Sequence, residues 1–86
     1  MPELRFDEKV WADYLEAQQD KQRIRRINEL IKDTLRTPFS GLGKPEPLKH
    51  GTPNRWSRRI SETDRLVYRV EKDAIVILQC KGHYDD

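Results

Sequence analysis

The spacing of apolar residues in the first 36 positions predicts a short strand followed by two amphipathic helices. Apolar and polar residues alternate over residues 3–6, which is typical of a strand. Farther along, apolar residues recur every three or four positions, the period of a helix that buries one face. The residues with this spacing are Val10, Trp11, Tyr14, Leu15, Ile24, Ile27, Leu30, Ile31 and Leu35.

The ends of these two helices are marked by residues that cap or interrupt helical backbone. Asp7 and Asp20 stand just before the two apolar stripes. Aspartate is favoured at the N-cap, where its side chain accepts a hydrogen bond from an unpaired backbone N–H. Pro38 disfavours helical geometry at Thr37, so the second helix should end there. A break at residues 19–21 predicts that the two helices form an antiparallel hairpin.

Residues 37–54 predict a loop, and the residues after them predict three strands in succession. The loop holds four of the five prolines and three of the four glycines, with room for a short edge strand at residues 46–50. Residues 55–61 and 65–71 alternate apolar and polar side chains. Residues 73–81 form an almost continuous apolar run, which is typical of a central strand.

The order of these elements predicts a single α+β domain over residues 1–86. Its helical hairpin would pack on one face of a mostly antiparallel, twisted sheet that includes the short N-terminal strand. Alternation along the strands assigns each residue to one face of the sheet. The residues expected to face the helices are Trp56, Ile60, Leu66, Tyr68, Val70, Val76, Leu78 and Cys80. Arg59, Arg65 and His83 are then expected on the opposite, open face.

Length and composition exclude several classes of protein. The 86 residues include a single cysteine, so neither a disulfide framework nor a cysteine-based zinc site is expected. No apolar run reaches the length needed to span a membrane, and the segment MPELRFDEKV lacks the pattern of a signal peptide. We therefore expect a soluble, cytoplasmic protein that does not associate with membranes.

The net charge of +2 conceals an uneven distribution of charge along the chain. Residues 1–20 carry two basic and six acidic side chains, residues 21–65 carry twelve and five, and the remaining residues carry three and four. A central cationic block of this kind attracts polyanions, of which nucleic-acid backbone is the commonest. For Arg23, Arg25 and Arg26 alone, a solvated helix face is the simpler interpretation, and contact with RNA backbone is the alternative.

The polar residues left after these assignments could act together on RNA without a metal ion. They are Glu46, Lys49, Arg59, Arg65 and His83. A carboxylate can take the proton of a ribose 2′-hydroxyl, an imidazole can protonate the leaving 5′-oxygen, and cations can stabilise charge that develops on phosphorus. Taken singly, each residue also has an ordinary structural explanation, such as a solvated arginine or a surface histidine. The residues alone leave both interpretations open.

Other kinds of site find little support in the sequence. His50 and His83 have no carboxylate or thiol at metal-ligand spacing, so neither a metal nor another cofactor is expected. Ser57 and Ser61 lie on a predicted strand, without the turn that exposes a catalytic nucleophile. The glycines of GLGKPEP are followed by prolines, where a nucleotide-binding loop requires a helix.

Four motifs follow one another along most of the chain. They are RINELIKDT (residues 26–34), RTPFSGLGKPEPLKH (36–50), WSRRISETDRLVYRV (56–70) and the pair HY (83–84). In this combination they closely resemble the YoeB toxins of the RelE superfamily. The resemblance implies a RelE-like fold and a toxin of a type II toxin–antitoxin pair. Such a toxin is a ribosome-dependent endoribonuclease, or mRNA interferase, which cuts mRNA in the A site without a metal and inhibits translation.

The resemblance also implies roles for single residues and a set of partners. Glu46 matches the general base, His83 the general acid, and Arg65 the residue that stabilises the transition-state phosphate. Residues that hold the RNA are implied at Lys49, Arg59 and Tyr84. The implied partners are an acidic, YefM-like antitoxin, the 70S ribosome with its mRNA, and a second copy of the chain.

The chain departs from the family pattern near the HY pair. Gly82 stands where family members often have an aromatic residue, and it should loosen this segment. Asp85 and Asp86 follow the pair. Two alternatives remain: a toxin of the same fold that binds a protein target such as gyrase, and an inactive module that binds the ribosome or RNA. Gyrase-directed relatives lack the charged set described above, which favours RNA cleavage over the first alternative.

Overall fold

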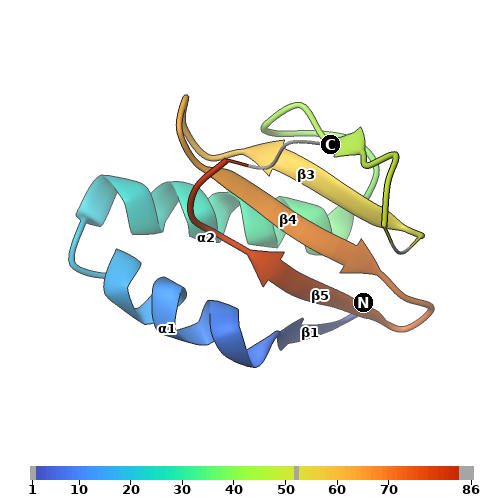
Figure 1. Ribbon diagram of the computed structural model, residues 1–86, viewed down its shortest axis with the longest axis horizontal. Helices are drawn as coiled ribbons and strands as arrows, with labels where there is room; N and C mark the ends of the chain where they lie inside the picture. The colour runs from blue at the N-terminus through green and yellow to red at the C-terminus, as the bar shows by residue number, and fades with distance from the viewer. Residues whose placement is uncertain (1, 52, 84–86) are drawn as a thin grey trace.

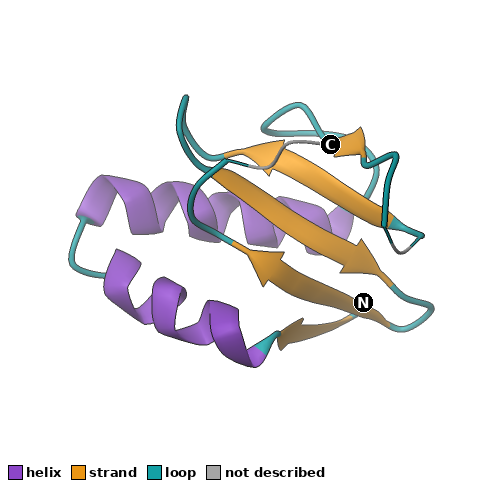
Figure 2. Ribbon diagram, viewed as in Figure 1, coloured by secondary structure: helices purple, strands orange, loops and turns teal. Residues whose placement is uncertain are grey.

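The computed structural model describes residues 2–51 and 53–83, which form a pair of helices and a five-stranded sheet (Figure 1, Figure 2). The elements in chain order are β1 (Glu3–Phe6), α1 (Glu8–Ala17), α2 (Lys21–Arg36), β2 (Glu46–Pro47), β3 (Arg55–Arg59), β4 (Arg65–Val70) and β5 (Ala74–Gln79). In Figure 1, which is viewed from the open face, α2 passes behind the sheet and α1 lies at the lower left. The predicted α+β architecture is confirmed.

Both helices begin at the aspartates that the sequence indicates. The carboxylate of Asp7 accepts a hydrogen bond from the backbone N–H of Lys9 at 3.0 Å. Asp20 caps α2 in the same way and accepts from two N–H groups at 3.1 Å. Each such cap typically contributes about 1 kcal/mol, because it satisfies N–H groups that have no partner inside the helix. α2 ends at Arg36, as expected from the position of Pro38.

The sheet is mixed and has the strand order β1-β5-β4-β3-β2. Neighbours from β2 to β5 pair antiparallel, whereas β1 runs parallel to β5. The edge strand β2 is shorter than the predicted segment of residues 46–50. It ends at Pro47, which has no N–H to donate to a ladder. One further bond, from the N–H of Leu48 to the carbonyl of Arg55 at 2.8 Å, precedes a bend at Lys49.

The core lies between the helices and the sheet. Its buried side chains are Val10, Ala17, Ile27, Leu30, Ile31, Ile60, Leu66, Tyr68, Ile75, Ile77 and Cys80. Burying each of the larger aliphatic side chains contributes about 1.5–3 kcal/mol. Within the described residues, no helix has the length and apolar character needed to cross a membrane.

The facing of β5 differs from the prediction. Ile75 and Ile77 belong to the core cluster beneath the helices, whereas Val76 and Leu78 do not. The prediction was wrong because a continuous apolar run offers no alternation from which a facing can be inferred. In such a strand only the pairing with neighbouring strands decides which side chains meet the helices.

The pairing of β4 with β5 contains an irregularity that matters for the C-terminal segment. Tyr68 pairs with Ile77, but Val67 pairs with Gln79, so β5 has one residue more than β4 at this point. A bulge of this kind changes the face of every later residue on its strand. Cys80 therefore lies in the core on the helical side, as predicted. The facing predicted for Val76 and Leu78 was wrong.

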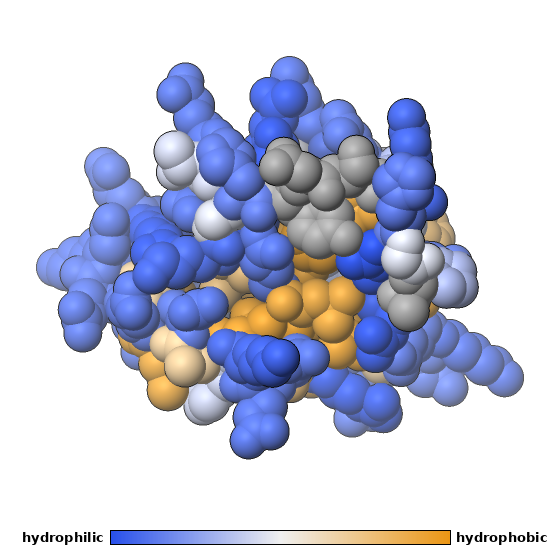
Figure 3. Space-filling view, viewed as in Figure 1, coloured by the Kyte–Doolittle hydropathy of each residue, from blue (hydrophilic) through white to orange (hydrophobic). Residues whose placement is uncertain are grey.

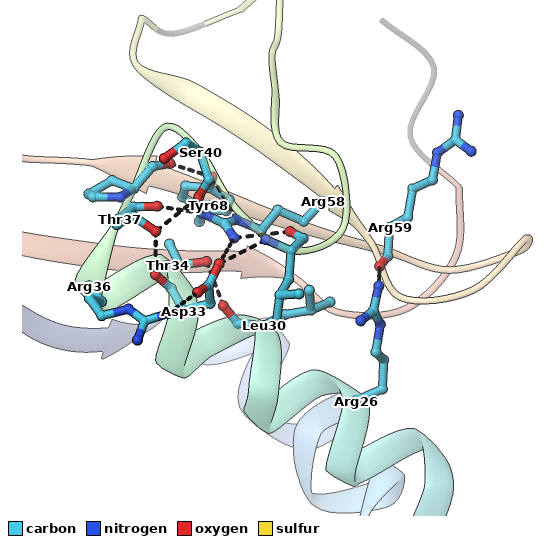
Figure 4. Close-up of polar contacts among 12 residues, drawn as sticks. Arg26, Leu30, Asp33, Thr34, Arg36, Thr37, Ser40, Arg58, Arg59 and Tyr68 are labelled. Atoms are coloured by element: carbon cyan, nitrogen blue, oxygen red, sulfur yellow. Dashed lines mark hydrogen bonds and ion pairs between the residues drawn. The ribbon is translucent and has the colours of Figure 1, made fainter.

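A buried ion pair joins α2 to β3. Arg58 has no exposed surface, and its guanidinium lies 2.8 Å from the carboxylate of Asp33 (Figure 4). Its Nε also donates to the hydroxyl of Tyr68 at 3.1 Å, and that hydroxyl donates to the carbonyl of Pro38 at 2.6 Å. Burying a charge is costly unless it is paired and hydrogen-bonded. Here both conditions are met, so the pair connects the two layers at a fixed point.

Arg58 also fixes the loop that follows α2. Its guanidinium donates to the backbone carbonyls of Thr37, Ser40 and Leu42, at 2.6, 2.9 and 3.0 Å. The next residue, Gly43, has a positive φ of 78°, and its carbonyl accepts from the N–H of Arg59 at 2.7 Å. These contacts determine where the chain enters β2 three residues later.

Candidate functional site on the open face of the sheet

Every second residue of β3 and β4 projects to the face opposite the helices. The register places Arg55 opposite Arg69, Ser57 opposite Val67 and Arg59 opposite Arg65. The residues between them include Trp56, Leu66 and Tyr68, which pack in or against the core, so these three pairs lie on the open face. The predicted facing of Arg59 and Arg65 is confirmed. Figure 3, from this side, shows hydrophilic side chains around a central apolar surface.

Arg59 and Arg65 stand close together on this face. The N–H of Arg59 donates to Gly43, and that of Arg65 donates to Gly82 at 3.0 Å, so neither donates to the other. In such a non-hydrogen-bonded antiparallel pair the Cα atoms lie about 4.5 Å apart and the side chains approach closely. Figure 4 shows the Arg59 side chain extending away from α2. Like charges directly opposite each other are destabilising, so this pair favours an anion between them.

In the second arginine pair on this face, Arg55 and Arg69, one member has a counter-charge. Arg69 forms an ion pair with Glu71 at 2.9 Å, and Arg5 lies 3.7 Å from the same carboxylate group. Among residues 2–51 and 53–83, neither Arg59 nor Arg65 has a carboxylate within ion-pair distance. The Arg59–Arg65 end of the face is therefore the part best suited to bind an external anion.

Glu46 lies on the neighbouring edge strand. Its Cα partner is Ser57, which is two residues from Arg59 on the same face. Diagonal neighbours of this kind lie about 7–8 Å apart, within reach of long side chains. Glu46 is exposed, so its carboxylate is open to a ligand at the arginine pair. The structure thus brings together three of the residues predicted from the sequence.

Lys49 lies at the other end of β3. It follows Leu48, whose N–H donates to Arg55 at the start of β3, and it occupies an exposed bend. Arg59 is the last residue of β3, so about 13 Å of strand separates the backbone of Lys49 from the level of Arg59. The structure does not bring the backbone of Lys49 to the arginine pair.

His83 reaches this end of the sheet through a turn rather than through a longer strand. β5 stops at Gln79, and the chain then curves to the end of the sheet where β4 begins (Figure 1). The N–H of Gly82 donates to Asp64 Oδ1 at 2.7 Å, and its carbonyl accepts from the N–H of Arg65 at 3.0 Å. Gly82, which was expected to loosen this segment, is thus held by two hydrogen bonds, and His83 follows directly after it.

Two residues of this region were missed in the sequence. The amide Nε2 of Gln79 donates to the carbonyls of Gly82 and His83, at 3.0 and 3.1 Å. The N–H of Gly82 lowers the pKa of Asp64 below its ordinary value, because the hydrogen bond favours the ionised carboxylate. No sequence signal identifies these contacts, since they depend on the irregular pairing of β4 with β5.

The three arginines in the first turns of α2 lie in different surroundings. Arg25 is exposed, whereas Arg26 donates to the carbonyl of Arg59 at 3.1 Å and so supports the end of β3 (Figure 4). Arg23 is half-buried, and its Nε and Nη2 find no hydrogen-bond partner in the described part of the chain. Arg26 thus has a structural contact of its own, and RNA contact stays a prediction for all three.

Some predicted features fall on residues that the structure does not describe. Tyr84, predicted to hold RNA, and the pair Asp85 and Asp86 lie outside the described residues. Within the described ranges, no group of three or more His, Cys, Asp or Glu side chains could hold a metal ion. The described site therefore consists of the Arg59–Arg65 pair, which has no carboxylate partner among the described residues. The exposed carboxylate of Glu46 lies on one side of the pair, and the hydrogen-bonded segment that leads to His83 lies on the other.

Solved structures with the same arrangement of elements are bacterial toxins. The YoeB/ParE toxin from Agrobacterium tumefaciens is 42% identical, with a TM-score of 0.88 over 95% of this chain and 99% of that chain. The YoeB dimer from Staphylococcus aureus is 41% identical, with a TM-score of 0.88 over 96% and 98%. YafQ from E. coli is 12% identical with a TM-score of 0.78 over 96% and 94%, a likeness of fold alone. The fold is thus that of the small RelE-like toxins.

Sequence comparison identifies the family within this class. The family model of the YoeB-like toxin of bacterial type II toxin-antitoxin systems matches residues 6–84. Toxin YoeB of Escherichia coli K12 is 56% identical over 82 residues, which cover 94% of this chain and 98% of that protein. Toxin RelK of Mycobacterium tuberculosis is 44% identical over 85 residues, which cover 98% and 100%. The chain belongs to the family of YoeB-like toxins of bacterial type II toxin–antitoxin systems.

Proposed function

We propose that this toxin is an endoribonuclease that cuts mRNA in the ribosomal A site and thereby inhibits translation. The observation that carries the proposal is the Arg59–Arg65 pair, which has no carboxylate partner among the described residues and lies between Glu46 and the His83 segment. A phosphodiester is an anion of the right size to lie over two neighbouring guanidinium groups. The site then offers a base and an acid on the two sides of that phosphate.

In the proposed reaction, the carboxylate of Glu46 takes the proton of a ribose 2′-hydroxyl. The 2′-oxygen attacks phosphorus, and the bond from phosphorus to the 5′-oxygen breaks. The protonated imidazole of His83 gives its proton to the leaving 5′-oxygen, so the products are a 2′,3′-cyclic phosphate and a 5′-hydroxyl. Arg65 and Arg59 stabilise the negative charge that grows on the phosphate oxygens. Protons and charges balance among these four side chains.

The order of strands supports this assignment. An in-line displacement requires the base and the acid on opposite sides of phosphorus. β2 carries Glu46, β3 and β4 carry the arginines, and the segment before His83 follows β4 on its other side. The backbone of β2 is separated from that of the His83 segment by three interstrand spacings, which amount to about 14 Å. The side chains of Glu46 and His83 can reach inward across this distance to the two sides of a phosphate.

Other residues would hold the RNA rather than react with it. We assign Lys49 and Tyr84 to the RNA backbone or bases on either side of the cut. A tyrosine can stack on an unpaired base, as in many single-strand readers. Of the three arginines in the first turns of α2, the exposed Arg25 is the best placed to contact ribosomal RNA, since Arg26 bonds β3 and Arg23 is half-buried.

The partners proposed for this chain follow from its relatives. Solved structures from Staphylococcus aureus include a YoeB dimer and a heterotetrameric YoeB-YefM toxin-antitoxin complex. We propose that this chain likewise forms a homodimer and is neutralised by an acidic, YefM-like antitoxin in the cytoplasm, where its ribosomal target lies. An acidic partner complements the arginine pair on the open face.

Single-turnover cleavage on ribosomes programmed with a reporter mRNA tests the proposal. His83→Gln and Glu46→Gln should bind ribosomes normally and cut about 10²–10⁴-fold more slowly, the usual contribution of a positioned acid or base. His50→Gln is the matched control and should cut like the unmodified toxin. If His83→Gln cuts within a few-fold of the unmodified toxin, His83 is not the acid. Growth arrest without mRNA cuts would favour a protein target instead.

A further inference from the structure

We infer that Asp64 and Gln79 are positioning residues that clamp the Gly82–His83 peptide against the start of β4. The inference rests on the proposed role of His83 as the acid, and it adds two residues that had no role in the site predicted from the sequence. Neither would touch the RNA. Each would act on cleavage through the place that it gives to His83.

The backbone of Gly82 and His83 is held from three directions. Asp64 Oδ1 accepts from the N–H of Gly82 at 2.7 Å. The carbonyl of Gly82 accepts from both the N–H of Arg65 and the Nε2 of Gln79, each at 3.0 Å. The same Nε2 reaches the carbonyl of His83 at 3.1 Å. The side chain of Gln79 thus binds the carbonyls of Gly82 and His83, and that of Asp64 binds the N–H of Gly82.

The grip of Asp64 is itself preorganised by the turn between β3 and β4. The N–H groups of Ile60 and Ser61 donate to the carbonyl of Asp64 at 3.0 and 3.2 Å. The N–H of Asp64 donates to the Ser61 hydroxyl at 3.1 Å, and that hydroxyl donates to Asp64 Oδ2 at 3.3 Å. The second carboxylate oxygen is thereby held, which leaves Oδ1 aimed at Gly82.

The segment needs such a clamp because, among the described residues, the backbone bond from Arg65 does not fix it alone. Gly82 has a φ of +82°, and no heavy atom of the described residues, apart from its chain neighbours, lies within 4 Å of where a side chain would be. A glycine in open space gains the most freedom when its hydrogen bonds are lost. β5 has ended at Gln79, so the segment has no strand ladder to hold it. A misplacement of about 1 Å at a reacting group can cost about 100-fold in rate.

The ion pair between Lys81 and Glu16 lies near this segment but does not account for the position of His83. Lys81 forms an ion pair with Glu16 of α1 at 3.0 Å, but both side chains are about half exposed. Exposed pairs of this kind contribute little, since water and salt screen them. The contact also lies on the helical side of the chain, whereas the clamp acts on the peptide beside Arg65.

Gln79→Met removes the donor and keeps the shape and the charge of the side chain. We expect single-turnover cleavage to fall about 10- to 100-fold, with ribosome binding within about twofold of the unmodified toxin. In the His83→Gln background, Gln79→Met should have no further effect, because two residues that act through one group are not additive. Gln19→Met, in the exposed turn between the helices, is the matched control.

Asp64 offers a conservative rescue. Asp64→Asn keeps an oxygen that can accept from Gly82 and should retain most of the cleavage rate, whereas Asp64→Ala should lose about 10-fold or more. Asp73→Asn in the β4–β5 turn controls for the lost charge. Hydrogen exchange should show the Gly82 amide protected in the unmodified toxin and exposed in Asp64→Ala.

The outcomes separate this inference from the proposed function. The clamp is overturned if Gln79→Met cuts like Gln19→Met, or if it slows cleavage equally with and without His83. It is also overturned if the Gly82 amide exchanges freely in the unmodified toxin. An active His83→Gln toxin would instead overturn the proposed acid, and the clamp would then be judged by hydrogen exchange alone.

Discussion

Asp33 shows how much can depend on a single carboxylate. It pairs with the fully buried Arg58 at 2.8 Å and also accepts from the N–H of Leu42 at 2.9 Å. Removing one partner of a buried pair leaves a charge without compensation, which typically costs about 3–5 kcal/mol. We therefore expect Asp33→Ala to lower the free energy of unfolding by about that amount in urea titrations.

Arg36→Ala is the control for this prediction, because it removes only the exposed partner of the same carboxylate. An exposed ion pair contributes about 0–1 kcal/mol, so the control should change stability little. If Asp33→Ala and Arg36→Ala were equally stable, the buried pair would not support the loop as described.

Cys80 illustrates the opposite case, a side chain that should be chemically quiet. It has no exposed surface, and burial raises the pKa of its thiol to about 11. Only the thiolate reacts with alkylating agents. At pH 8 we expect native protein to react with iodoacetamide at least about 100-fold more slowly than protein unfolded in urea, in which the ordinary pKa of about 8.5 returns. Equal rates would show that the thiol is accessible in the folded state.

At the scale of the elements, the loop between α2 and β2 leaves little room for a side chain at Gly43. A Cβ added there would lie 2.8 Å from Leu30 Cδ2 and 3.1 Å from the carbonyl of Arg59, at a φ of +78°. We expect Gly43→Ala to destabilise the fold by about 1–3 kcal/mol, the usual range for strain and overpacking. Because the loop leads into Glu46, cleavage should fall more than ribosome binding.

Gly51→Ala provides a comparison in the next connection, between β2 and β3. Gly51 also has a positive φ, of 88°, but the atoms nearest to an added Cβ belong to the flexible side chain of Arg55. The backbone strain is therefore similar and the collision is easier to relieve. Urea unfolding and single-turnover cleavage should both be affected less by Gly51→Ala than by Gly43→Ala. Equal cleavage by the two variants would contradict a special role for Gly43.

The elements could be predicted from the sequence where a period or a cap was present. Both helix starts, at Asp7 and Asp20, and the facing of Arg59 and Arg65 follow from local spacing. The facing of β5 could not be predicted, because its apolar run carries no alternation. The contacts of Gln79 could not be predicted either, since they arise from an irregular register between two strands.

At the scale of the whole molecule, the carboxylates of Asp33 and Asp64 make the free energy of unfolding depend on pH. The N–H of Leu42, followed by Arg58, lowers the pKa of Asp33, and the N–H of Gly82 lowers that of Asp64. Both folded values lie below the unfolded value of about 3.9. The stability that they contribute is therefore present above about pH 4 and is lost as the pH falls through the folded values.

Urea titrations at pH 6, 4 and 3 should show this loss. Asp64→Asn cannot gain the proton, so its stability should fall less between pH 6 and 3 than that of the unmodified toxin. Asp73→Asn serves as the control for a lost surface charge and should keep the full loss. Parallel acid profiles for Asp64→Asn and the unmodified toxin would show that the bond to Gly82 is not coupled to protonation.

The parallel pairing of β1 with β5 has a consequence for the order in which the chain folds. Glu3 pairs with Ala74, whereas β2 to β5 are consecutive and pair locally. Closing a loop of about 70 residues costs roughly 4 kcal/mol of chain entropy, so β1 should dock after the hairpins have formed. We expect Phe6→Ala to speed unfolding and leave the refolding rate nearly unchanged in stopped-flow experiments, with Leu66→Ala slowing refolding. The open face that carries Arg59 and Arg65 would then assemble before the first strand joins the sheet.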